Sequence, residues 1–335
     1  MTFNKIVFLA LVIILLFLAI IYALMAGNYD ISFTTIKNVF LKELFNVQIQ
    51  EFKKMDKVII YDIRFPRIIM AILVGFSLGI AGSIYQGCFK NPLVEPFILG
   101  ASSGAAFGAS LAIIFALKFI SFWAFIFSIF AVFVSYFLAK DKENISIVSL
   151  ILSGVIVGSI FSALVSILKY ISDDTGLREI TFWIMGGLYY SNLKDGLIFA
   201  VVIFIVFMIV LKFSYRLNLL ALGDDEAKSL GIDPNKNKLF FILLATLVTS
   251  LSVANVGIIA WIGLMMPHAT RLIVGADNRW VLPLSGILGA IYLLFCDTIA
   301  RTLTHTEIPV GIITSILGAP FLIYLLKTKK SRLLK

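Results

Sequence analysis

Apolar runs of about 20 residues recur along almost the whole chain, and this pattern constrains the fold more than any other feature. The runs cover residues 6–26, 66–86, 97–117, 121–139, 146–168, 195–213, 238–256, 258–275, 281–300 and 308–326. Only 14% of the 335 residues are charged, compared with about 25% in soluble domains, and the charges lie mainly between the runs. The sequence therefore predicts an all-α, polytopic membrane protein of about ten transmembrane helices in a single domain, residues 1–335.

The stretch from Phe97 to Ala139 holds only one charge, Lys118. As one helix it would be about 65 Å long, roughly twice the thickness of the bilayer core. We therefore expect a hairpin that turns near Lys118. The apolar run after Lys5 exceeds the usual length of a signal peptide core, so we expect an uncleaved first span.

Several classes of function are disfavoured. The formal net charge of +9 does not indicate nucleic-acid binding, because many of the cations lie at the ends of apolar runs. Cys88 and Cys296 are far apart, so we expect two buried thiols, no disulfide and no metal site. The chain has no G-x-x-x-x-G-K-[ST] phosphate loop and no catalytic pair at helical spacing. We therefore expect neither an enzyme nor a resident cofactor, and any ATP hydrolysis would occur in a separate partner.

Basic residues indicate the orientation in the membrane. Five cations lie between Lys327 and Lys335, directly after the last apolar run, which favours a cytoplasmic C-terminus. An even number of spans then places the N-terminus on the same side. We expect a multi-pass protein of the cytoplasmic (inner) membrane, with residues 28–65 outside and residues 215–237 in the cytoplasm.

The outer segment, residues 28–65, carries Ile36, Val39, Phe40 and Leu44 at helical spacing. This pattern predicts an amphipathic helix that lies at the outer membrane surface.

Arginines flank the point where this segment enters the next span. We expect Pro66 in the first helical turn, between Arg64 and Arg67, because proline's missing N–H is no loss there. The two arginines either anchor the helix among lipid headgroups or offer guanidinium groups to carboxylates of an external partner. Farther along, Asp297 and Arg301 are four residues apart, so they share a helix face and can pair.

The cytoplasmic segment contains the signals of a helix shorter than two turns. Acidic residues open it, a glycine closes it and a proline follows: Asp224, Asp225, Glu226, Gly231 and Pro234. Such a helix is marginal alone, so it must dock either against its own bundle or against another protein. Ala227 and Leu230 would give it a small apolar edge at the surface.

These features resemble the FecCD family of importer permeases, which includes vitamin B12, ferric siderophore and haem permeases. The resemblance rests on several separated motifs in the same order: Arg64-Phe65-Pro66-Arg67, Asn91 to Pro96 with Leu99-Gly100, Phe182 to Gly187, Leu222 to Gly231, Gly263 to Leu272, Asp297 to Arg301, and Ile308 to Gly311 with Leu317 to Pro320. It implies the type II ABC importer permease fold, a homodimer with the path between its subunits, two cytoplasmic ATP-binding subunits and an extracytoplasmic substrate-binding protein.

The resemblance also implies roles for three groups of residues. The residues implied to couple the permease to the ATPase are Gly223, Asp224, Asp225, Glu226, Ala227, Leu230 and Gly231. Arg64, Arg67 and Arg301 match arginines that receive acidic residues of the binding protein. Asn91 and Leu93 match a constriction at the cytoplasmic end of the path.

The expected function is ATP-driven alternating access that moves an iron chelate inward. A ferric siderophore is the favoured cargo, with haem and cobalamin as alternatives. The competing function is that of a secondary transporter or channel that needs no ATPase.

Overall fold

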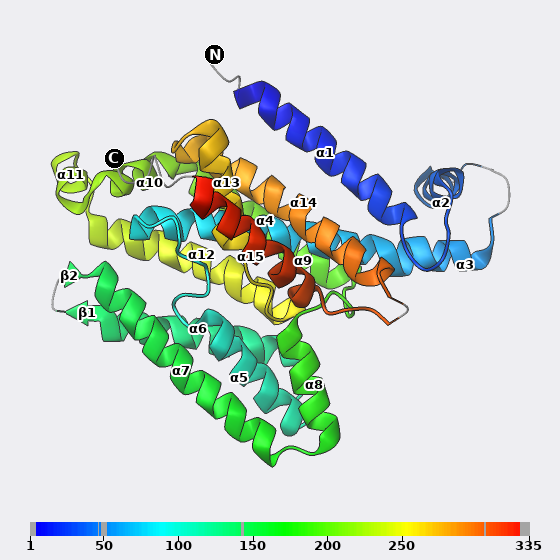
Figure 1. Cartoon of the computed structure of the whole chain (residues 1–335), viewed down its shortest axis with the longest axis horizontal. Helices are drawn as coiled ribbons and strands as arrows, with labels where there is room; N and C mark the ends of the chain where they lie inside the picture. Colours follow the sequence, from blue (N-terminus) through cyan, green and yellow to red (C-terminus); the bar gives the residue numbers. More distant parts are fainter. Residues whose placement is uncertain (1–4, 46, 48–51, 142–143, 305, 329–335) are drawn as a thin grey trace.

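The computed structural model describes residues 5–45, 47, 52–141, 144–304 and 306–328, and most of them lie in helices (Figure 1). Among these residues, 7 helices are long and apolar enough to span a membrane, and three shorter apolar helices accompany them. The long spans are α1 (Lys5–Met25), α4 (Phe65–Phe89) with the turns before it, α6 (Ile120–Ala139), α7 (Ile147–Ile171), α9 (Leu193–Lys212), α12 (Pro234–Val256) and α14 (Asn278–Thr302). The shorter ones are α5 (Ala101–Ile114), α13 (Ile262–Val274) and α15 (Val310–Thr328).

Every apolar run of the sequence corresponds to one of these helices, which confirms the all-α, polytopic architecture. The expected hairpin is also present, because α5 ends at Ile114 and α6 begins at Ile120, on either side of Lys118. The basic tail after Thr328 lies outside the described residues.

The remaining elements are short. They are α2 (Phe33–Phe45), α3 (Lys54–Lys57), the π-helix η1 (Val58–Arg64), β1 (Lys140–Asp141), β2 (Asn144–Ile145), α8 (Asp174–Met185), α10 (Ser214–Leu222) and α11 (Asp224–Ser229). In α2, Ile36 and Val39 are buried, and the Phe40 ring meets Phe65 edge to face with centroids 5.5 Å apart. The apolar face expected for the outer segment therefore packs on the start of α4.

Pro66 lies in the first turn of α4, as expected. However, α3, η1 and α4 run on without a break, so that one helix extends from Lys54 to Phe89 over 36 residues. The helix therefore begins about three turns before the apolar run that predicted it. Its π-helical turns directly precede the proline, whose missing N–H leaves the normal helical pattern incomplete.

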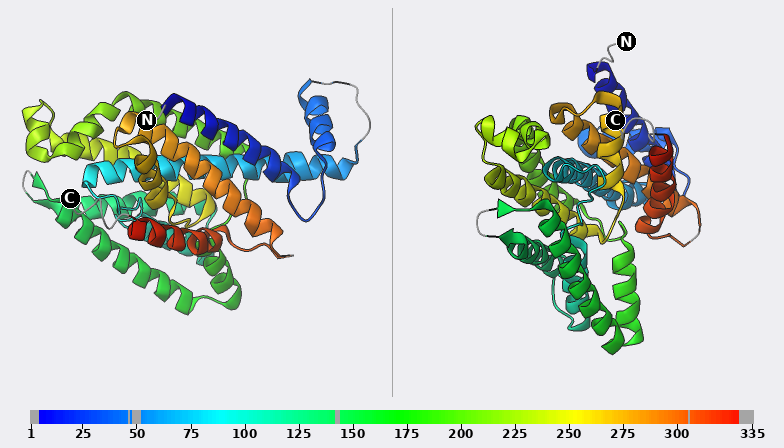
Figure 2. Two further views of the ribbon diagram at one scale, coloured as in Figure 1. Left: turned by 45° about the horizontal axis from the view of Figure 1, so that its top comes forward. Right: turned by 60° about the vertical axis from the view of Figure 1, so that its left-hand side comes forward.

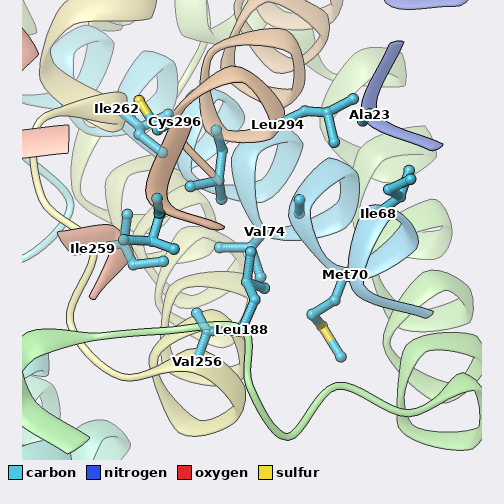
Figure 3. Close-up of a cluster of buried hydrophobic side chains, with 14 of the residues drawn as sticks. Ala23, Ile68, Met70, Val74, Leu188, Val256, Ile259, Ile262, Leu294 and Cys296 are labelled. Carbon is cyan, nitrogen blue, oxygen red and sulfur yellow. The ribbon is translucent and has the colours of Figure 1, made fainter. Parts of the chain in front are cut away.

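The central helix of the bundle is α4, which contacts α9, α12, α13 and α14 (Figures 1 and 2). Its first half packs into a core with α13, α14 and the segment before α13, as seen around Val74, Ile259 and Leu294 (Figure 3). Cys88 and Cys296 are buried, free thiols, as expected. By contrast, α1 exposes many large apolar side chains, which suits contact with lipid because lipid tails are the solvent there.

The two ends of α4 carry different groups. Arg64 and Arg67 lie at its beginning, whereas Lys90, just after its end, forms an ion pair with Asp224 of α11. At 1.5 Å per residue, the 25-residue helix α4 places the two groups about 35–40 Å apart. The N-terminal end of α1 and the C-terminal end of α15 point to the side of the bundle where α11 lies (Figure 1).

Candidate functional site

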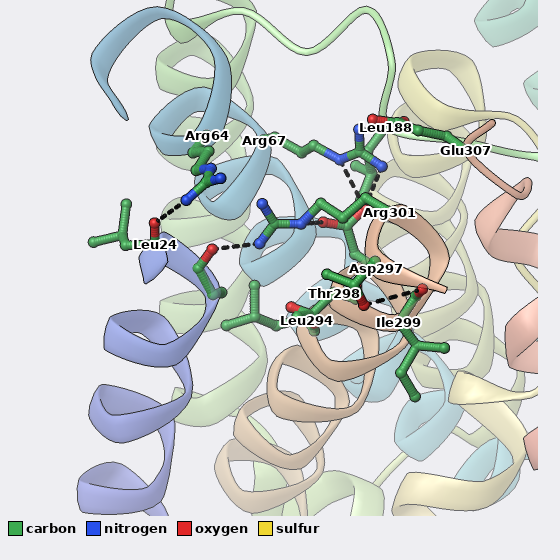
Figure 4. Close-up of polar contacts among 12 residues, drawn as sticks. Leu24, Arg64, Arg67, Leu188, Leu294, Asp297, Thr298, Ile299, Arg301 and Glu307 are labelled. Carbon is green, nitrogen blue, oxygen red and sulfur yellow. Dashed lines mark hydrogen bonds and ion pairs between the residues drawn. The ribbon is translucent and has the colours of Figure 1, made fainter. Parts of the chain in front are cut away.

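The three arginines implied to dock a binding protein are buried within this chain. Arg64, Arg67 and Arg301 are 4%, 6% and 6% exposed, and they lie together with Asp297 and Glu307 (Figure 4). We call these five residues the arginine cluster. The helices α4 and α14 pack side by side, so their residues at this end meet although they are distant in sequence.

Arg64 and Arg301 bind backbone carbonyls at the C-terminal end of α1. Arg64 Nη1 donates to the carbonyl oxygens of Leu24 at 2.6 Å and Met25 at 2.9 Å. Its Nη2 donates to the Tyr29 carbonyl at 2.6 Å, and Arg301 Nη2 donates to the Ala23 carbonyl. The last carbonyls of a helix lack intrahelical donors and carry partial negative charge, so two guanidinium groups are well suited to cap them.

Arg67 bridges two carboxylates. Its Nε lies 2.8 Å from Asp297 Oδ1, its Nη2 lies 2.8 Å from the same oxygen, and its Nη1 lies 2.6 Å from Glu307 Oε2. Arg301 Nε lies 3.6 Å from Asp297 Oδ2, so the pairing expected from their spacing is present. The Asp297 side chain is fully buried, whereas that of Glu307 is 38% exposed. The cluster thus has a buried interior and one acid at the surface.

The docking role of these arginines stays a prediction, since the structure gives each of them a partner inside the chain. Sequence reasoning missed the capping of α1 because Arg64 and its Leu24 acceptor are 40 positions apart, and Arg301 and Ala23 are 278 apart. It also missed Glu307, whose only local signal is its place in the loop before the last apolar run.

At the opposite end, α11 is the short helix that the sequence predicted. It spans Asp224–Ser229, and Gly231 follows with φ of 83°, a left-handed conformation that favours glycine. The preceding helix α10 was not anticipated. It packs against α4, α11 and α14, so that the segment 215–237 rests on the bundle.

The expected apolar edge of α11 is only half correct. Ala227 is 0% exposed and packs into the core beneath the helix, so its place at the surface was wrong. A single methyl group fits beneath a helix that lies close to its neighbours. Leu230, just after α11, is 55% exposed, and Leu222, the last residue of α10, is 62% exposed. The helix therefore docks on its own bundle, while one leucine before it and one after it stay exposed.

Asp224 fastens α11 to two spans. Its carboxylate lies 2.9 Å from Nζ of Lys90, just after α4, and 2.6 Å from Nζ of Lys238, near the start of α12. Lys238 is buried, with its side chain 5% exposed. Burial raises the pKa of Asp224, but the two lysines lower it more, so the pKa lies below the ordinary value and the carboxylate is charged at neutral pH.

The loop after α4 contains the residues implied to form the cytoplasmic constriction. Leu93 N donates to Asn91 Oδ1 at 2.9 Å, which closes a tight turn and leaves the Leu93 side chain 50% exposed. The same loop is fixed to the start of α13, because Glu95 Oε1 accepts from Trp261 N at 2.9 Å. The role of Asn91 and Leu93 as a gate stays a prediction.

Comparison with known proteins gives consistent matches over almost the whole chain. Residues 14–328 match the model of the FecCD transport family. The molybdate import system permease protein MolB of Haemophilus influenzae is 39% identical over 332 residues, which is 97% of each chain. The hemin transport system permease protein HmuU of Yersinia pestis is 38% identical over 280 residues, covering 81% of this chain and 84% of that protein.

A solved structure gives the same result for the fold. It shows an inward-facing conformation of a metal-chelate type ABC transporter and superposes with a TM-score of 0.85 at 34% identity. The match covers 96% of this chain and 99% of the solved one. The expected permease fold is therefore confirmed.

Proposed function

This chain is an ABC importer permease of the FecCD transport family, and we propose that it carries an iron chelate across the cytoplasmic membrane. Two similarities support this cargo: the similar solved structure is of a metal-chelate type transporter, and the relative HmuU is named for hemin transport. A ferric siderophore is the favoured cargo, and haem or cobalamin are alternatives.

The observation that carries the mechanism is the pair of sites at the two ends of α4. At one end, Asp224 ties α11 to Lys90 after α4 and to Lys238 of α12, and the flanking residues Leu222 and Leu230 are exposed. Exposed leucines on both sides of a short helix that is held by ion pairs suit docking to a separate subunit. In the proposed mechanism, ATP-driven closure of that subunit moves α11, and Asp224 passes the movement to the spans.

The proposed assembly is a homodimer with two cytoplasmic ATP-binding subunits and one extracytoplasmic binding protein. In this arrangement α11 faces the cytoplasm and the arginine cluster faces outward. Both chain termini are then cytoplasmic. This agrees with Figure 1, in which the N-terminal end of α1 and the C-terminal end of α15 point to the side of α11. Alternating access moves the cargo through the path between the two copies.

Co-purification with the ATP-binding subunit tests the importer function. Leu230→Asp places a charge on the docking face, so we expect it to abolish most of the association and the transport. Leu303→Asp is a matched control, because Leu303 is a similarly exposed leucine (64%) just after α14, at the opposite end of the bundle. If the parent protein transports its cargo without any ATP-binding subunit, it is a secondary transporter or channel instead.

Molybdate is a second candidate cargo, because MolB matches 97% of the chain. Uptake into proteoliposomes that contain the whole transporter distinguishes the two. We expect ATP-dependent accumulation of a radiolabelled ferric siderophore and little accumulation of molybdate. The reverse result would assign molybdate and reject the iron chelate.

A further inference from the structure

We propose that Glu307 occupies on Arg67 the place of an acidic side chain of the external binding protein, and that docking exchanges one carboxylate for the other. This inference rests on the proposed importer function and deepens its outer docking surface. It also divides the three arginines: Arg67 meets the partner, whereas Arg64 and Arg301 hold α1 in place.

The first step is that Arg64 and Arg301 are already committed. Three carbonyl oxygens accept from Arg64, and one carbonyl of α1 accepts from Arg301. Turning either side chain outward would leave buried carbonyls without donors, which opposes such a movement. An ion pair between a partner and Arg64 or Arg301 would therefore come at the expense of hydrogen bonds that hold the end of α1.

The second step is that Arg67 divides its guanidinium group between a fixed and an exchangeable partner. Nε and Nη2 face the fully buried Asp297, which lies on the packed helix α14. Nη1 faces Glu307, which lies on the loop between α14 and α15. Loss of the Asp297 contact would strand a buried charge, whereas Glu307 is at the surface and can be hydrated when displaced.

The third step is that the exchange preserves the charge balance of the cluster. Arg67 has only 7% of its side chain exposed, so it needs a carboxylate at Nη1 both before and after docking. An incoming Asp or Glu supplies the same acceptor in the same position. The Tyr189 ring, 5.7 Å from Arg67 Cζ and 37% exposed, flanks this position and offers a surface for the partner.

The exchange makes Glu307 a competitor of the binding protein. The test is the affinity of the cognate extracytoplasmic binding protein for the nucleotide-free permease with its ATP-binding subunits in lipid nanodiscs. Glu307→Gln removes the competing charge, so the binding protein should bind about three- to fivefold more tightly, the range of a partly exposed ion pair. Unchanged or weaker binding overturns the proposal.

A charge-matched control separates exchange from the general field of the surface. Glu43 forms an ion pair with Lys57 at 2.8 Å on α2 and α3, near the same end of the bundle. Glu43→Gln removes the same charge but leaves Arg67 paired. An affinity gain as large as that of Glu307→Gln would mean that only the general field matters, and would reject the exchange.

A double variant tests the route through Arg67. Arg67→Gln should weaken docking about tenfold or more. Adding Glu307→Gln to it should then give no further gain, because no competition remains to be relieved. Thermal melting and ATP-binding-subunit association confirm that each variant is folded. A gain that persists without Arg67 overturns the exchange alone, whereas failure of the parent complex to associate or transport rejects the importer function itself.

Discussion

Gly82 lies where α4 crosses the start of α13, and a Cβ at this position would overlap the carbonyl oxygen of Gly263. The Gly263 carbonyl is part of the backbone and the added Cβ is bonded to it, so neither atom can move unless the two helices separate. Gly82→Ala should therefore lower the free energy of unfolding by about 1–3 kcal/mol, the usual cost of overpacking. Thermal melting of the purified protein in detergent measures the change.

Gly196→Ala is the matched control for this substitution. A Cβ at Gly196, in α9, would meet only Ile69 Cγ2 at 3.5 Å, an ordinary contact. Alanine also favours a helix over glycine by about 1 kcal/mol, so the melting temperature should stay constant or rise. If both variants lost melting temperature to a similar extent, the close approach of α4 and α13 would not explain the effect at Gly82.

Local sequence signals predicted α11 well, but they did not predict what its residues touch. The acids at its start, Gly231 at its end and Leu230 at the surface all follow from neighbouring positions in the chain. The burial of Ala227 depends on how closely α11 lies to the bundle, and the partners of Asp224 come from α4 and α12. The pattern of neighbouring residues does not indicate contacts between residues that are far apart in the sequence.

At the scale of elements, α1 is held at one end by arginines from two other helices. The carbonyls of its last turn accept from Arg64 and Arg301, while most of its length is exposed. The contact between α1 and α14 is therefore reinforced where the chain leaves the helix toward α2. A helix with so little buried surface depends strongly on such an anchor.

Arg64→Met should release the end of α1 because three carbonyls lose their donor. We expect a loss of about 2–4 kcal/mol in the free energy of unfolding. Hydrogen exchange should accelerate in the last turn of α1 and at residues 26–32. Arg279→Met is the control, since Arg279 is exposed and pairs with its neighbour Asp277. Slow exchange throughout α1 in the Arg64 variant would contradict the anchoring role.

The seven long spans among the described residues were predictable because bilayer thickness sets their length, whatever their neighbours are. The helices α8 and α10 were not, since both are short and lie outside the apolar runs. The start of α4 was also missed. Its first turn, Lys54–Lys57, is polar, and Asp62 and Arg64 separate the next turn from the apolar run, so hydropathy alone did not include them.

At the scale of the whole molecule, α4 is the structural link between the two candidate sites. It begins beside the arginine cluster and ends beside α11, and it packs on α9, α12, α13 and α14 along the way. In the proposed mechanism, a displacement of α11 reaches the bundle through Asp224 and its two lysines as well as through the packing of Ala227. These ion pairs offer a place to interrupt the proposed coupling while the exposed Leu222 and Leu230 stay unchanged.

Asp224→Asn should retain the ATP-binding subunit and its hydrolysis, yet reduce transport per ATP hydrolysed by about fivefold or more. The amide keeps the shape but loses the charge that holds Lys90 and the buried Lys238. Asp174→Asn, an exposed acid on α8, is the control. The pKa of Asp224 is lowered in the folded protein. Its ion pairs with the two lysines are therefore fully formed above the ordinary carboxyl pKa of about 4, and they are lost only as the pH falls through the lowered pKa. The ratio of transport to ATP hydrolysis in the parent protein should therefore stay constant between about pH 5 and 8. If Asp224→Asn keeps the parent ratio, α11 acts through another contact.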